Sequence, residues 1–70
     1  MKLHYDEKAG ALYLRLDDSE IVGSEEVKPG IVLDFNDEQQ VVGIEVLDLK
    51  RRIPKVDLEQ LRVEVASSTG

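Results

Sequence analysis

The segment GIVLDFNDEQQVVGIEV, residues 30–46, decides the fold because it reads as two β-strands joined by a polar turn. In each strand every second residue is large and apolar, which is the period of a half-buried β-strand. The apolar positions are Ile31, Leu33, Phe35, Val42, Ile44 and Val46. With residues 37–40 as the loop, Leu33 faces Ile44 and Phe35 faces Val42, so this register predicts a hairpin that buries every apolar pair.

The same segment also has the ligand spacing of a calcium-binding EF-hand loop, with Asp34 at the first position and Glu45 at the last. An EF-hand loop follows a helix, whereas Pro29 and Gly30 precede this one and its flanks alternate with period 2. Gln39 stands where such a loop requires glycine. The spacing is therefore attributed to an acidic hairpin, and we expect neither a bound metal nor another cofactor.

Three further strands are predicted before this hairpin. Residues 11–16, ALYLRL, alternate strictly, residues 3–5 form a short first strand, and residues 20–27 form a weaker one. Residues 28–31, Lys-Pro-Gly-Ile, fit a type II turn because proline fixes the second position and glycine supplies the positive φ of the third. Strands joined by short connections usually pair as antiparallel neighbours, so residues 2–48 predict a five-stranded antiparallel meander.

A different pattern follows Asp48. Asp57 can cap a helix whose third residue is Gln60, a capping-box spacing, and apolar residues then recur on one helical face up to Val65. The competing interpretation is a sixth strand, because the LRVEV segment also alternates. We predict an α+β fold in which a short C-terminal helix, residues 57–65, packs on one face of the meander.

The chain has 70 residues and no cysteine. We expect one β-rich domain over residues 1–65 and a disordered tail over residues 66–70. A domain of this size buries only about 60% of its unfolded surface, so an oligomer is the expected source of additional burial. The absence of cysteine, of an N-terminal apolar segment and of a membrane-spanning apolar run predicts a cytoplasmic protein without membrane attachment.

Charge is distributed unevenly along the chain. The net charge is −6, with −8 over residues 1–48 and +2 over residues 49–70. An acidic body repels phosphate backbones and anionic lipids, so nucleic acid and membranes are not expected as partners. A small basic protein is a candidate partner, because an acidic surface attracts a cationic one.

Four segments resemble the domain of unknown function 2283 family of small bacterial and archaeal proteins. They are Tyr5-Asp6, Ala11-Leu12-Tyr13, the segment from Gly30 to Asp34 and, most specifically, the segment from Val41 to Asp48. The resemblance implies a compact β-rich fold with a C-terminal helix and supplies no activity. It also implies that the protein could be the acidic partner of a basic, toxin-like protein. Gln39-Gln40 stands near the end of the second hairpin turn, where the family usually has glycine.

The outward positions of the strands provide the candidate ligand-binding residues. These are Tyr13, Arg15, Asp34, Gly43 and Glu45, with His4 nearby. The predicted register makes the two carboxylates diagonal neighbours beside a glycine gap, which could hold a small polar ligand or a metal, or perform acid and base catalysis. The alternative is a solvated or interface face on which Arg15 pairs with a carboxylate. Because a flat sheet makes no pocket by itself, we expect no enzyme activity.

Val32, Val41 and Leu47 add an apolar component to the outward face. We therefore predict a non-catalytic protein-interaction module that homodimerises through this face or through an unprotected edge strand. The first alternative is an antitoxin-like protein that neutralises a small basic toxin or nuclease. The second is a small-ligand or metal-binding site on the outward face.

Overall fold

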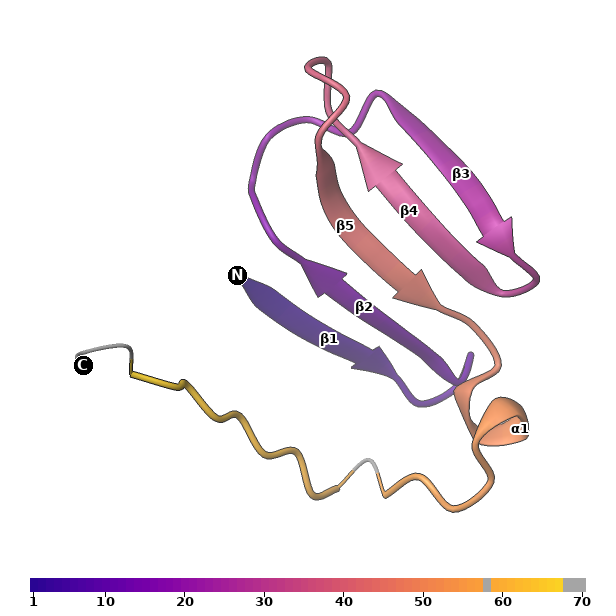
Figure 1. The fold of residues 1–70 in the computed structure, drawn as a ribbon. Helices are drawn as coiled ribbons and strands as arrows, with labels where there is room; N and C mark the ends of the chain where they lie inside the picture. Colours follow the sequence, from indigo (N-terminus) through magenta and orange to yellow (C-terminus); the bar gives the residue numbers. More distant parts are fainter. Residues whose placement is uncertain (58, 68–70) are drawn as a thin grey trace.

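The computed structural model describes residues 1–57 and 59–67, which form one antiparallel sheet with a short helix at one end (Figure 1). The strands are β1 (Lys2–Asp6), β2 (Ala11–Arg15), β3 (Gly23–Lys28), β4 (Ile31–Phe35) and β5 (Val41–Val46), and the helix is α1 (Leu49–Arg52). The predicted class, α+β with five antiparallel strands and a short C-terminal helix, is confirmed. Within the described ranges, no helix has the length and apolarity needed to cross a membrane.

The strand order is β1-β2-β5-β4-β3, so β5 lies between β2 and β4, and the predicted pairing of the second strand with the third is not made. Residues 16–22 instead carry the chain from β2 to the far edge, which gives strands β2 to β5 a Greek-key arrangement. The composition explains the order. Every residue of β3 is exposed, which suits an edge, whereas Val42 and Gly43 of β5 are buried in the middle of the sheet.

The register of the β4–β5 hairpin is confirmed at Leu33 opposite Ile44 and Asp34 opposite Gly43. It differs at Phe35, which pairs with Val41 and not with Val42, because a β-bulge lies between Asp34 and Phe35 in this ladder. The turn fixes the pairing next to it: Gln39 has a φ of 61°, its N–H donates to the Asn36 carbonyl at 3.1 Å, and the Asn36 N–H donates to the Gln40 carbonyl at 3.1 Å. A three-residue loop with its last residue in the left-handed region is a common hairpin turn, and the bulge one pair further along restores the predicted register at Asp34 and Gly43.

The C-terminal prediction was wrong in position, because α1 spans Leu49–Arg52 and residues 57 and 59–65 have no regular secondary structure. Asp57 does accept the Glu59 N–H at 3.0 Å, a local bond of the capping kind, but a two-turn helix is marginal without packing against the sheet. The competing sixth strand is absent from the described ladders as well. Leu58 and residues 68–70 of the predicted tail lie outside the described residues.

The two faces of the sheet have different compositions. One, named the apolar face, carries Leu3, Tyr5, Leu12, Leu14, Ile31, Leu33, Phe35, Ile44 and Val46. Most of these side chains are half-buried and Leu3 is exposed; Val42, which alternation along β5 places on the same face, is buried, and the other buried hydrophobic residue of the described chain is Leu49. Figure 1 shows why: α1 lies at one end of the sheet, the segment after it runs along the side of β1, and neither covers the centre of the sheet.

Candidate functional site

The opposite face, named the polar face, carries two rows of side chains that cross all five strands. The first row is Lys2, Arg15, Gly43, Asp34 and Ser24, and the second is His4, Tyr13, Glu45, Val32 and Glu26. The five residues predicted as a ligand site, Tyr13, Arg15, Asp34, Gly43 and Glu45, lie in these neighbouring rows on three adjacent strands. The strand pairing therefore brings all five together.

Asp34 is the least exposed of the buried polar residues in the described chain, with 2% of its surface exposed. Its Oδ1 accepts a hydrogen bond from Ser24 Oγ at 2.5 Å, while Oδ2 is buried and has no hydrogen-bond partner among the described residues. A β-carbon at Gly43 would lie 2.8 Å from that Oδ2 and 3.0 Å from the Tyr13 hydroxyl. The space beside Gly43 is thus filled by these two side chains, and glycine is needed there to admit them.

Glu45 is the second carboxyl group of this cluster. Burial raises its pKa, and the adjacent Asp34 carboxyl raises it further. Two carboxyl groups at close range favour a state in which one of them keeps a proton. A proton on Glu45 would also supply a donor near Asp34, whose Oδ2 otherwise lacks one.

Arg15 does not fill the expected role of partner to a carboxylate. Within the described part of the chain its Nε donates to the Asp17 carbonyl at 2.6 Å, one terminal nitrogen donates to the Ser19 carbonyl, and the other donates to the Tyr13 hydroxyl at 3.2 Å. The guanidinium therefore holds the loop after β2 and orients Tyr13. The carboxyl pair is left without a cation from Arg15.

This arrangement is suited to holding a proton more than to binding a ligand. Asp34 is closed off from solvent, and Gly43 leaves no free volume. Across residues 1–57 and 59–67, no three His, Cys, Asp or Glu side chains come close enough together to hold a metal ion. A ligand could reach Asp34 only if Tyr13 or Glu45 moved aside.

Two residues with structural roles at this face were not predicted. Ser24 lies opposite Asp34 in the β3–β4 ladder, and that register could not be read from the weakly patterned third strand. Asn36 is 5% exposed, and its Oδ1 accepts the N–H groups of Glu38 and Gln40, each at 3.0 Å. An asparagine at the start of a turn is a recognisable signal for such bonds.

The predicted interface residues lie apart from one another. Val32 is half-buried between Glu45 and Glu26 in the second row of the polar face. Val41 and Leu47 are exposed, at 37% and 38%, at opposite ends of β5. Their role in an interface stays a prediction.

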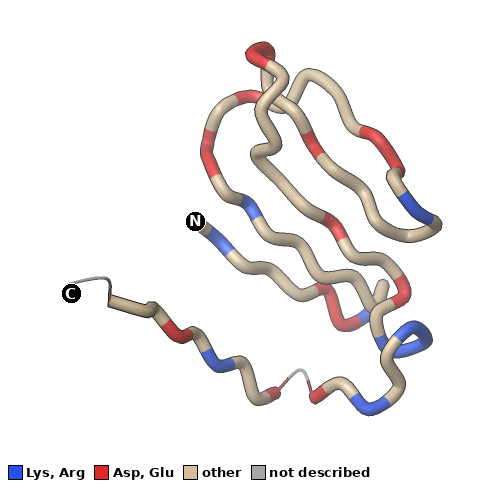
Figure 2. The backbone as a smooth tube through the Cα atoms, in the orientation of Figure 1, with Lys and Arg blue, Asp and Glu red and all other residues tan. Residues whose placement is uncertain are grey.

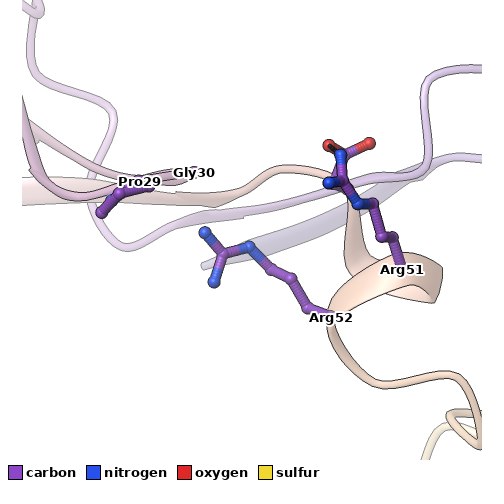
Figure 3. A pocket seen from close by; sticks show the side chains of 5 residues that line it. Pro29, Gly30, Arg51 and Arg52 are labelled. Carbon is purple, nitrogen blue, oxygen red and sulfur yellow. Dashed lines mark ion pairs between the residues drawn. The ribbon is translucent and has the colours of Figure 1, made fainter.

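A separate hollow of about 360 Å³ lies where α1 meets the β3–β4 turn (Figure 3). It is lined by Pro29, Gly30, Asp48, Arg51 and Arg52. The Arg52 side chain points toward Gly30, and its Nε donates to the Leu47 carbonyl at 3.1 Å. Gly30 has a φ of 81°, and any β-carbon there would collide with the guanidinium, so glycine both makes the turn and admits Arg52.

Comparison with known proteins gives one family. The sequence profile of the family described as "Protein of unknown function (DUF2283)" matches residues 2–50, which include all five strands and the start of α1. No curated protein and no solved structure matches the chain. The matched residues contain both rows of the polar face and most of the chain, and the protein therefore belongs to the DUF2283 family.

Proposed function

We propose that the protein is a non-catalytic interaction module that forms a homodimer by packing the apolar faces of two sheets together. A sheet with one hydrophobic face has to bury that face against another layer, and in the described chain Leu49, Ile53 and Val56 cover only the part of the face near Leu3, Tyr5 and Leu12. The observation that carries the proposal is that, of the nine residues named on the apolar face, eight are half-buried and Leu3 is exposed.

The charges of the apolar face favour a second copy as the covering layer. Its positions on β1, β2, β4 and β5 are all uncharged, and charged residues, Glu25 and Lys28, enter it only from the edge strand β3. Two chains of net charge −6 can therefore approach through this face while most of their acidic groups stay in solvent. Strand geometry gives a face of roughly 24 by 17 Å, comparable with one layer of a β-sandwich.

The test compares two neighbouring residues of β4 that point to opposite faces. Leu33→Lys places a charge in the proposed interface, whereas Val32→Lys places the same charge on the polar face between Glu45 and Glu26. We expect sedimentation equilibrium to show a dimer for the wild type and for Val32→Lys, and at least about tenfold weaker association for Leu33→Lys. Circular dichroism would verify that both variants fold.

The opposite pattern, in which Val32→Lys dissociates the dimer and Leu33→Lys does not, would assign the interface to the outward face containing Val32, Val41 and Leu47. A wild type that stays monomeric up to about 1 mM would overturn the homodimer.

A second candidate function, neutralisation of a basic protein, is favoured by the acidic loops at one end of the sheet. The loops over residues 16–22 and 36–40 contain five acidic residues and no basic one. Binding of a cationic partner there would weaken steeply with salt. Capture of a small basic protein from the native organism at low salt, with release at about 0.5 M salt, is the expected result, and salt-independent binding would count against it.

A further inference from the structure

The two ends of the sheet carry opposite charge (Figure 2). The acidic end consists of the two loops just named, with Asp17, Asp18, Glu20, Asp37 and Glu38. The basic end consists of α1 and the two turns beside it, with Lys8, Lys28, Lys50, Arg51 and Arg52 against Asp6, Glu7 and Asp48. The strand ladders fix this polarity because all of the acidic loops lie beyond the Arg15 end of β2, and α1 lies beyond the other end.

Hydrogen bonds hold both sets of charges in place. Asp17 accepts the Ser19 N–H at 3.0 Å and the Ser19 hydroxyl, and these bonds keep the pKa of the Asp17 carboxyl below its usual value. Asn36 donates to the same hydroxyl at 3.2 Å, which ties the two acidic loops together. At the other end, the bond from Arg52 to Leu47 fixes one guanidinium over the hollow beside Gly30.

The segment that carries the basic residues also lies on the apolar side of the sheet. Leu49, Ile53 and Val56 share a hollow with three residues of the apolar face, Leu3, Tyr5 and Leu12. The basic end is therefore thicker than the acidic end on the side where a second copy would dock. Two copies stacked with like ends together would meet first at these thick ends, which would hold the centres of their faces apart.

From this polarity we infer that the two copies lie antiparallel, with the Arg51–Arg52 hollow of each against the Asp37–Glu38 turn of the other. The inference rests on the proposed homodimer and adds its orientation and its charged contacts. Like ends together would place acid against acid, whereas the antiparallel arrangement pairs opposite charges twice. A guanidinium next to an open hollow is suited to a carboxylate, because its planar N–H groups match the two carboxylate oxygens.

Charge reversal at one end and then at both ends tests the orientation. Arg51→Glu/Arg52→Glu and Asp37→Lys/Glu38→Lys each place like charges on the two sides of the proposed contact, and we expect each to weaken self-association about tenfold or more at low salt. The quadruple variant restores opposite charges at the contact between residues 51–52 and residues 37–38, so its dissociation constant should return toward the wild-type value. Glu26→Lys, which reverses one charge on the polar face of the edge strand β3 and outside both charged ends, is the control and should change the constant by less than about threefold.

The outcomes separate this inference from the proposed function. A wild-type dimer whose dissociation constant is unchanged by either end reversal would overturn the antiparallel orientation and leave the apolar-face dimer intact. Failure of the quadruple variant to recover, when both end reversals weaken association, would also overturn it, because the loss would then come from α1 or the turn alone. A monomeric wild type at about 1 mM would overturn both proposals.

Discussion

The polar face of this sheet has a buried centre at Asp34 and Gly43, whereas most of the apolar face is only half-buried. Asp34 and Gly43, on the face that the sequence pattern marks as outward, are buried, while Leu3 on the inward face is 38% exposed. Alternation along a strand indicates which residues share a face, but it does not indicate which face another layer covers. In a chain this short, the covering layer has to come from elsewhere, and the difference between the faces indicates where it is missing.

The packing of the polar face has a specific origin in side-chain size. Gly43 stands in the central strand between Arg15 and Asp34, and the missing β-carbon lets Asp34 and Tyr13 close over the backbone. On β1, β2, β4 and β5 every side chain of the apolar face is large, so none of these positions offers a comparable gap. The buried cluster therefore depends on one small residue.

Of the predicted substitutions, Gly43→Ala should have the largest effect on stability, because it disrupts the buried centre of the polar face. Its β-carbon would lie 2.8 Å from Asp34 Oδ2, and the bond to Ser24 limits how far Asp34 can move, so we expect a loss of about 1–3 kcal/mol in the free energy of unfolding. Gly23→Ala, where a β-carbon would meet nothing within 4 Å, is the matched control and should change stability by less than about 0.5 kcal/mol. Urea denaturation measures both, and equal effects would mean that the polar face is loosely packed.

Glu45→Gln tests the carboxyl pair of the polar face through the pH dependence of the free energy of unfolding. Because the pKa of Glu45 is raised, the folded state holds a proton that the unfolded state has released, and the unfolding free energy falls as pH rises from about 4.5 through the folded pKa. The groups facing Glu45 are Asp34 on β4 and Tyr13 on β2, which accepts a bond from Arg15. Glu45→Gln should remove this fall, so its free energy of unfolding should exceed that of the wild type by about 1 kcal/mol at pH 7 and differ little at pH 4.

Glu26→Gln is the control for this measurement because Glu26 lies in the same row on the exposed edge strand. Denaturation at several pH values should give parallel curves for Glu26→Gln and the wild type. Parallel curves for Glu45→Gln and the wild type would mean that the buried carboxyl pair does not hold a proton.

The smallest expected effect on stability is at the turn between β4 and β5. Gln39 has a φ of 61°, a region in which glycine is less strained, so Gln39→Gly should stabilise the chain by about 0.5 kcal/mol. Gln40→Gly, at the next position without a positive φ, should destabilise it slightly. A higher melting temperature for Gln40→Gly than for Gln39→Gly would contradict the left-handed conformation of Gln39 in the turn.

The sequence predicted the β4–β5 hairpin well because its apolar residues can pair in only one register, as Leu33 and Ile44 do. It missed the bulge between Asp34 and Phe35, since strict alternation does not mark Val42 as an extra residue in the ladder. It also missed the position of β5 between β2 and β4. The pairing of strands that are distant in the sequence depends on which strand is buried and therefore has a neighbour on each side. The helix was misplaced because the local signal at Asp57 was not supported by packing, whereas Leu49 is buried.

The sequence predicted which residues share the candidate site, but not the packing and hydrogen bonds of their side chains. Alternation placed Tyr13, Asp34 and Glu45 on one face, which the ladders confirm as their arrangement. The filled space at Gly43 and the hydrogen bonds of Arg15 to backbone carbonyls depend on side-chain conformations and on the loop after β2. These details are fixed by three-dimensional packing and leave no trace in residue spacing.

The two edges of the sheet differ in their capacity to add further strands. In β3, the register shifts between Glu26 and Lys28, and Glu25 projects onto the apolar face, so this edge resists pairing with another chain. The other edge, β1, pairs with β2 in an unbroken register over residues 2–6. Growth by strand addition could therefore begin at β1 but would end at β3, which limits any edge-to-edge assembly to two copies and opposes the formation of fibres.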